Sequence, residues 1–157
     1  MEFNIFISHS TKESSFGSAI ANYLKRIPDV IPFLSEENVI EGSLSESLIS
    51  KIKTCDVFIV LYSVNSHNSQ YVQNEVGVAR GSNKPILILA MDNTKPTAML
   101  SGFAYYTLYD PSAEDSLPKV YEYIKEKVKG KADITGLLVF LGFLGGLGLG
   151  YFLSRKK

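Results

Sequence analysis

The sequence has 157 residues, enough for one domain of ordinary size plus an appendage. Lysine plus arginine and aspartate plus glutamate both number 16, so the formal net charge is zero, whereas domains that bind nucleic acid usually carry a basic excess. A single cysteine, Cys55, excludes an internal disulfide framework, and the only two histidines, His9 and His67, argue against a histidine-based metal site.

The first half of the chain alternates short apolar runs with amphipathic segments. Residues 3–10 and 30–34 are predicted strands, and a helix follows each of them. Ser10 with Glu13 and Ser43 with Glu46 have the spacing of capping boxes that would open these helices. The helical stripes that follow are Phe16, Ile20, Leu24 and Ile27, then Leu44, Leu48, Ile49 and Ile52.

The second half continues the alternation. Residues 56–63 form an unbroken apolar run that is typical of a buried central strand. Residues 66–81 are predicted as one helix that ends at Gly81, then residues 84–92 and 103–109 as strands and 113–129 as a last amphipathic helix. In the helix over 66–81, Val72, Val76 and Ala79 form a buried stripe, with the carboxylate of Glu75 beside it and Tyr71 one turn earlier.

Strands and helices that alternate with short links indicate an α/β fold with a parallel sheet and helices on both faces. Ligands of such sheets gather beyond the carboxyl ends of the strands. Four of these ends carry polar residues, namely Ser8, His9 and Ser10, then Ser35, Ser63 and Asp92. The glycine-rich phosphate-binding motifs GxGxxG and GxxxxGK[ST] are both missing from the sequence.

The C-terminal part has a different character. Residues 134–153 contain no charged side chain and have about the length needed to cross a bilayer as a helix. We therefore divide the chain into a domain at 1–130, a linker at 131–133, a transmembrane helix at 134–153 and a basic tail at 154–157. Gly142, Gly146 and Gly150 lie on one face of that helix, a spacing that favours close helix–helix contact in membranes. The alternatives are a hydrophobic helix buried in an oligomer, and glycines that are simply common in membrane spans.

Four blocks of sequence, in this order, resemble the TIR (Toll/interleukin-1 receptor) domain over residues 3–110. They are NIFISHS, IPFLSEENVIEGSLSESLISKIKTCD, VFIVLYSVNSHNSQYVQNEV and KPILILAMD. The resemblance implies a flavodoxin-like fold with a five-stranded parallel sheet. It also implies that residues 35–43 form the BB loop, which in the family gates the site and makes subunit contacts.

Many TIR domains cleave NAD+ with a glutamate in the pattern aromatic-x-x-x-Glu, which here is Tyr71 to Glu75. Most well-known members carry tryptophan where this chain has Tyr71. The resemblance therefore implies that Glu75 is catalytic and that NAD+ is a substrate, with no cofactor. A carboxylate suits this chemistry because breaking the nicotinamide–ribose bond builds positive charge on the sugar. The alternative for Glu75 is a solvated or N-capping helix acid.

Further residues are expected to bind the substrate. In the family, residues at the end of the first strand help to line the nucleotide pocket, so the resemblance implies this role for Ser8 and His9, and for Tyr71 as a flat wall of the pocket; the alternative for the strand-end residues is capping of the following helix. Ser63 ends the third strand at the same edge, where it would reach ribose or a turn amide. Glu41 and Ser43 would contribute from the BB loop. Cys55 is expected to be a small buried side chain and not a nucleophile.

The leading hypothesis is a membrane-anchored NAD+ glycohydrolase or cyclase in immune, anti-phage-type defence, switched on by self-association through the BB loop and the three glycines. The TIR domain is expected on the cytoplasmic side, because NAD+ is abundant inside cells and the first residues do not resemble a signal peptide. The charges that flank residues 134–153 do not decide the orientation. The alternatives are a non-enzymatic TIR adaptor and another nucleotide-handling enzyme, such as a nucleoside deoxyribosyltransferase.

Overall fold

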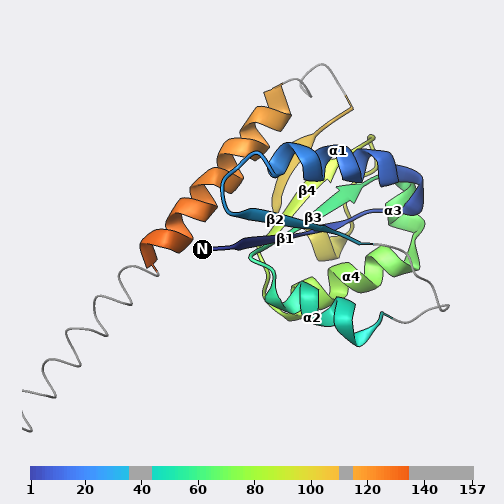
Figure 1. Cartoon of the computed structure of the whole chain (residues 1–157). Coiled ribbons are helices and arrows are strands. Elements are labelled where there is room, and N and C mark those ends of the chain that lie inside the picture. Colours follow the sequence, from blue (N-terminus) through green and yellow to red (C-terminus); the bar gives the residue numbers. More distant parts are fainter. Residues whose placement is uncertain (36–43, 110–114, 135–157) are drawn as a thin grey trace, which may run out of the picture.

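A computed structural model describes residues 1–35, 44–109 and 115–134. Five strands form one parallel sheet in the order β2-β1-β3-β4-β5 (Figure 1), which confirms the predicted flavodoxin-like α/β fold. The strands are β1 (Phe3–Ser8), β2 (Val30–Leu34), β3 (Val57–Tyr62), β4 (Ile86–Ala90) and β5 (Ala104–Thr107).

Helices cover both faces of the sheet and enclose two separate cores (Figure 1). One face packs against α1 (Ser14–Leu24) and against the helix over residues 115–134. The other packs against α2 (Glu46–Thr54) and α4 (Gln70–Gly81). Because side chains alternate along a strand, Ile5 and Ile7 of β1 enter the first core while Phe6 enters the second. Every residue of β3 is buried, as expected for a central strand.

The prediction of one helix over residues 66–81 is wrong. The structure has two helices there, α3 (Val64–Asn68) and α4, and they meet at Ser69. Ser69 has extended backbone angles, and its hydroxyl oxygen accepts a hydrogen bond from the backbone N–H of Val72 at 3.3 Å. It is therefore the N-cap of α4, a position that serine favours because its side chain satisfies a free N–H of the first turn.

The capping box predicted for Ser10 and Glu13 is not formed. Ser10 does cap the short 3-10 helix η1 (Thr11–Glu13), but the Glu13 carboxylate accepts hydrogen bonds from Ser63 and Asn65 at the start of α3. Helix α2 begins after Ser45, whose hydroxyl oxygen accepts from the N–H of Leu48 at 3.2 Å, so Ser45 takes the role predicted for Ser43. Ser43 lies outside the described residues.

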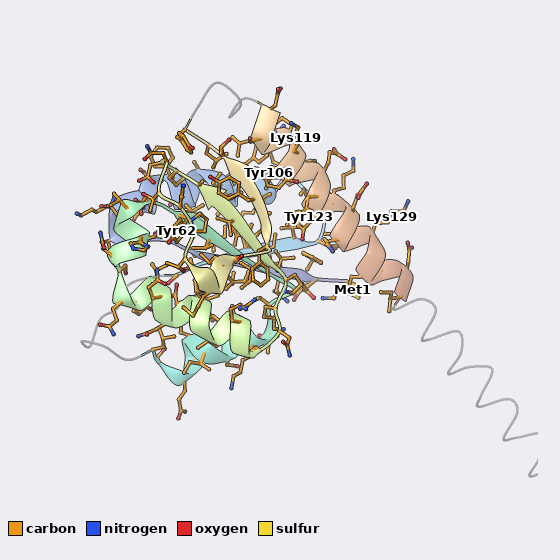
Figure 2. All side chains as sticks on the ribbon, turned by 180° about the vertical axis from the view of Figure 1, so that it is seen from behind. Met1, Tyr62, Tyr106, Lys119, Tyr123 and Lys129 are labelled. Atoms are coloured by element: carbon orange, nitrogen blue, oxygen red, sulfur yellow. The ribbon has the colours of Figure 1, made fainter. Side chains whose placement is uncertain are left out.

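The helix over residues 115–134 runs toward the amino-terminal edge of the sheet (Figure 1). Near its end, the Lys131 ammonium lies 2.7 Å from the Asp56 carboxylate and 2.8 Å from the carbonyl oxygen of Glu2. Figure 2 shows Lys129 and Met1 on this side of the molecule and Tyr62, the last residue of β3, on the other. No helix within the described ranges is long and apolar enough to cross a membrane. Apart from Ile134, the predicted span at 134–153 lies outside those ranges, as does the tail at 154–157.

Candidate functional site

Glu75 lies in the middle of α4, between buried apolar residues of the same helix. Its side chain has no exposed surface. One carboxylate oxygen accepts a hydrogen bond from the hydroxyl of Ser8, and the other accepts from the hydroxyl of Ser35. The structure therefore excludes the alternative of a solvated helix acid, and it places Glu75 against the sheet.

The strand pattern explains why two serines meet this carboxylate. Ser8 is the last residue of β1 and points to the same face as Phe6, the face that α4 covers. Ser35 follows β2, and its N–H bonds to the carbonyl oxygen of Ile7 at 2.9 Å, which extends the parallel pairing by one residue. The carboxyl ends of β1 and β2 thus bring both hydroxyls to Glu75.

Burial of a carboxylate is costly unless donors replace the water that it loses. Hydrogen bonds to an ionised acceptor are about twice as strong as neutral ones, so two hydroxyl donors offset part of this cost. Both serines are themselves buried. The three side chains form a buried polar cluster, which we call the Glu75 cluster (Ser8, Ser35 and Glu75).

The side chain of His9, which directly follows Ser8, faces the side of the sheet that α1 covers. His9 is 7% exposed, and its Nδ1 donates to the carbonyl oxygen of Ser10 at 2.8 Å. Gly17 of α1 makes room for the imidazole, because a Cβ at this position would lie 2.9 Å from His9 Cδ2. His9 therefore packs between the strand end and α1, on the face of the sheet away from Glu75.

Ser63 does not join the Glu75 cluster. It is the N-cap of α3, and its hydroxyl also donates to Glu13 Oε1 at 2.6 Å. The side-chain amide of Asn65 donates to the same oxygen at 2.8 Å. These side chains form a second polar group at the same edge of the sheet, which we call the Glu13 cluster (Glu13, Ser63 and Asn65).

The remaining predicted residues fall in two groups. Tyr71 is partly buried and packs against the second core, one turn before Glu75. Glu41 and Ser43 lie outside the described residues, as does most of the predicted BB loop. Among the described residues, no group of three or more His, Cys, Asp or Glu side chains could hold a metal ion.

Two side-chain contacts at the carboxyl ends of the strands are not predicted from the sequence, namely Ser35 with Glu75 and Glu13 with Ser63. The sequence places Ser35 at a strand end and at the start of the predicted BB loop, and Glu13 in a capping box, but it does not predict their partners. No local signal could have found either contact, because Ser35 lies 40 residues from Glu75 and Glu13 lies 50 residues from Ser63. The one usable signal is that Ser35 directly follows a predicted strand and Ser63 ends one.

Comparison with known proteins assigns this chain to a family. A family model described as "TIR domain" matches residues 5–120. This chain belongs to the TIR domain family. The match includes β1, α4 and β5, so both polar clusters lie within the TIR domain. A comparison with curated proteins gives no match.

Two solved structures of enzymes share the fold of this TIR domain. The CMP N-glycosidase of Clostridium botulinum is 16% identical, with a TM-score of 0.52 over 74% of this chain and 97% of its own. The 2-deoxyribosyltransferase of Bacillus psychrosaccharolyticus is 14% identical, with a TM-score of 0.55 over 75% of this chain and 90% of its own. At these identities the likeness establishes the flavodoxin-like fold alone.

Proposed function

We propose that this TIR domain protein is an NAD+ glycohydrolase or cyclase that breaks the nicotinamide–ribose bond, with Glu75 as its catalytic residue. The observation that carries the proposal is the Glu75 cluster: a fully buried carboxylate, with a hydroxyl on each oxygen, at the carboxyl ends of β1 and β2. Ligands of open parallel sheets bind at this edge.

The chemistry requires little more than one well-placed carboxylate. As the C–N bond breaks, its electron pair leaves with nicotinamide and positive charge develops on the ribose. The Glu75 carboxylate stabilises that charge and accepts a hydrogen bond from a ribose hydroxyl. Water then attacks the anomeric carbon and releases a proton, or an internal nucleophile of ADP-ribose closes a ring. Nicotinamide leaves as a neutral molecule, so no general acid is needed.

Ser8 and Ser35 are positioning residues in this proposal. Each hydroxyl donates one charge-assisted hydrogen bond to the carboxylate, and the two bonds together fix its plane and keep it in place. Ser35 comes directly before residues 36–43, the rest of the predicted BB loop. His9, Tyr71, Glu41 and Ser43 remain proposed substrate contacts.

The setting of the enzyme is also proposed. Residues 134–153 anchor the chain in a membrane with the TIR domain on the cytoplasmic side, and assembly through the BB loop and Gly142, Gly146 and Gly150 switches on the activity. Confinement to a membrane raises the effective concentration of subunits, which favours such assembly. Immune, anti-phage-type defence is the proposed role.

A substrate panel tests this function against its alternatives. The full chain, assembled in lipid, is incubated with NAD+, cytidine monophosphate and 2-deoxynucleosides, and the released base is measured by chromatography. We expect nicotinamide from NAD+ and no base from the other substrates. Cleavage of a nucleoside or nucleotide alone would indicate an enzyme of the kind named for the two solved structures. No base from any substrate would indicate a TIR adaptor.

A further inference from the structure

A second buried carboxylate lies at the same edge of the sheet and has no part in the proposed reaction. Glu13 ends η1, directly after β1, and is 5% exposed. Its Oε1 accepts from the Ser63 hydroxyl at 2.6 Å and from the Asn65 amide at 2.8 Å. Its Oε2 is buried and has no hydrogen-bond partner within the described part of the chain.

The place of Glu13 in the fold is significant. In the sheet order β2-β1-β3-β4-β5, the strand that follows β1 in the chain lies on one side of β1, whereas the strands that follow β3 lie on the opposite side of β3. The order in which strands are added therefore changes direction between β1 and β3. Glu13 follows β1, and its two partners follow β3. The Glu13 cluster therefore bridges the topological switch point, which is where open α/β sheets bind their ligands.

The two clusters flank the end of β1 on opposite faces of the sheet. Ser8 directs the Glu75 cluster toward α4, on the face of the second core. Ser63 continues the alternation of Ile59 and Leu61 of β3, which enter the first core, and it meets Glu13 just before α1 begins. A ligand that lies across the end of β1 would thus have one carboxylate on each side.

The contacts made by Oε1 do not explain why a carboxylate stands at position 13. Joining the β1 end to α3 needs one acceptor oxygen, which a neutral glutamine would also provide. Leaving a buried acceptor without a donor is costly, and native proteins rarely leave one in place without a use. Glu13 Oε2 therefore needs a hydrogen-bond donor, and the described part of the chain does not supply one.

We propose that Glu13 Oε2 accepts a hydrogen bond from a hydroxyl or amino group of the bound dinucleotide, and so helps to determine which nucleotide is bound. This inference rests on the proposed function. A hydroxyl or an N–H fits the oxygen, whereas a phosphate does not, because two negative groups would repel each other. Because Oε2 is closed to solvent, binding must part η1 from α3, a helix of only five residues.

The test uses binding, with turnover blocked by Glu75→Gln. Dissociation constants of the full chain in lipid nanodiscs are measured by calorimetry, with and without Glu13→Gln, which keeps an acceptor for Ser63 and Asn65 but turns Oε2 into a donor. The ligands are NAD+ and three analogues. Each analogue removes one donor: NADP+ the adenosine 2′-hydroxyl, nicotinic acid adenine dinucleotide the carboxamide N–H, and nicotinamide hypoxanthine dinucleotide the adenine amino group.

We expect Glu13→Gln to weaken NAD+ binding about tenfold or more, as for loss of a hydrogen bond to a charged group. One analogue should show a similar loss when Glu13 is present and no further loss in the Glu13→Gln chain, which identifies the donor by a double-mutant cycle. The exposed Glu126→Gln is the matched control and should change nothing.

Three outcomes would overturn the inference. Unchanged NAD+ affinity in a folded Glu13→Gln chain would show that Oε2 meets no ligand, and loss of folding would show that Oε2 carries a structural contact. If NAD+ binds neither variant and the parent chain does not cleave it, the proposed function falls together with the inference. If NAD+ binds with the same affinity in the presence and absence of Glu13→Gln, only the inference is overturned, and the proposed function is not.

Discussion

At the scale of single residues, the hydroxyls of Ser8 and Ser35 hold the buried carboxylate of Glu75. We predict that Ser8→Ala and Ser35→Ala each lower the free energy of unfolding by about 1–3 kcal/mol, because each removes a hydrogen-bond donor from a buried carboxylate. Chemical denaturation measures this loss. Ser47→Ala, at an exposed position of α2, is the control and should stay close to the parent. Equal stability of all three variants would mean that the two hydrogen bonds are not formed in solution.

Cys55 is a second residue whose surroundings fix its chemistry. Burial raises the pKa of the Cys55 thiol to about 11, although the positive charge of Lys84 lowers it in part. Relative to a thiol of pKa 9.0, the thiolate fraction near neutral pH is then about a hundredfold smaller. We predict very slow modification of the folded chain by iodoacetamide at pH 8 and rapid modification in denaturant, followed by mass spectrometry. Fast labelling of the folded chain would show that the thiol is accessible.

At the scale of secondary structure, the strands were more predictable than the helix boundaries. β3 is identifiable because a run of apolar residues can be buried on both faces only in the middle of a parallel sheet. The break at Ser69 was not identifiable in the same way. A serine can occupy a helix interior or an N-cap, and the stripe of Val72, Val76 and Ala79 does not reveal where the helix begins.

Hydrogen bonds to the carboxylate of Asp92 link the start of α3 to the loop that follows β4. One carboxylate oxygen accepts from the N–H of Val64 at 2.9 Å, and the other from the N–H of Thr94 at 2.9 Å. Burial alone would raise the pKa of Asp92, but hydrogen bonds from Thr94 and Val64 outweigh it, so the pKa is lowered. The stabilisation is therefore complete above the unfolded-state pKa and is lost as the pH falls through the folded-state pKa.

We predict that Asp92→Asn unfolds at a lower urea concentration than the parent at pH 7, because an asparagine amide cannot accept both hydrogen bonds. The difference should shrink below about pH 4, where the parent carboxylate also becomes protonated. Asp133→Asn, at an exposed position, should show no such dependence on pH. A difference that stays constant from pH 7 to pH 3 would contradict the assigned role of the charge.

At the scale of the whole molecule, different features lie at the carboxyl ends and at the amino ends of the strands. The Glu75 and Glu13 clusters lie at the carboxyl ends of the strands, whereas the last described helix ends at the amino-terminal edge (Figure 1). If residues 134–153 enter a membrane, the candidate site faces away from it. Subunits could then associate through their membrane helices without covering the strand ends.

We predict that replacing Gly142, Gly146 and Gly150 with leucine lowers NAD+ cleavage several-fold at a fixed surface density, because larger side chains keep the membrane helices apart. Nicotinamide release from reconstituted liposomes measures the effect. Clustering of residues 1–134 on a nickel-lipid surface through an added tag should restore activity without the span. This shorter chain keeps the contact of Lys131 with Asp56, which a chain ending at residue 130 would lose. Unchanged activity of the leucine variant at low density would show that the glycines are not the switch.

The candidate site was predictable in part. Ser8 could be named because it ends a predicted strand, and Glu75 because the resemblance to TIR domains singles out the glutamate of the pattern aromatic-x-x-x-Glu; the structure joins the two side chains directly. Ser63 was assigned to the same edge but faces the other side, because one step along an extended chain reverses the direction of a side chain. The Glu13 cluster depends on how η1 and α3 approach each other, and no periodicity of the sequence encodes that approach.

The central claim is that Glu75 breaks the nicotinamide–ribose bond, and nicotinamide release by Glu75→Gln tests it most directly. Glutamine keeps the shape of the side chain; one of the two serine hydroxyls can still donate to the amide oxygen while the other rotates to accept from the amide N–H, so the fold should persist. We predict a fall of about 10²–10³-fold or more in nicotinamide release with an unchanged circular dichroism spectrum. Glu126→Gln should retain the activity of the parent. Full activity in a folded Glu75→Gln chain would contradict the assignment of Glu75 as the catalytic residue.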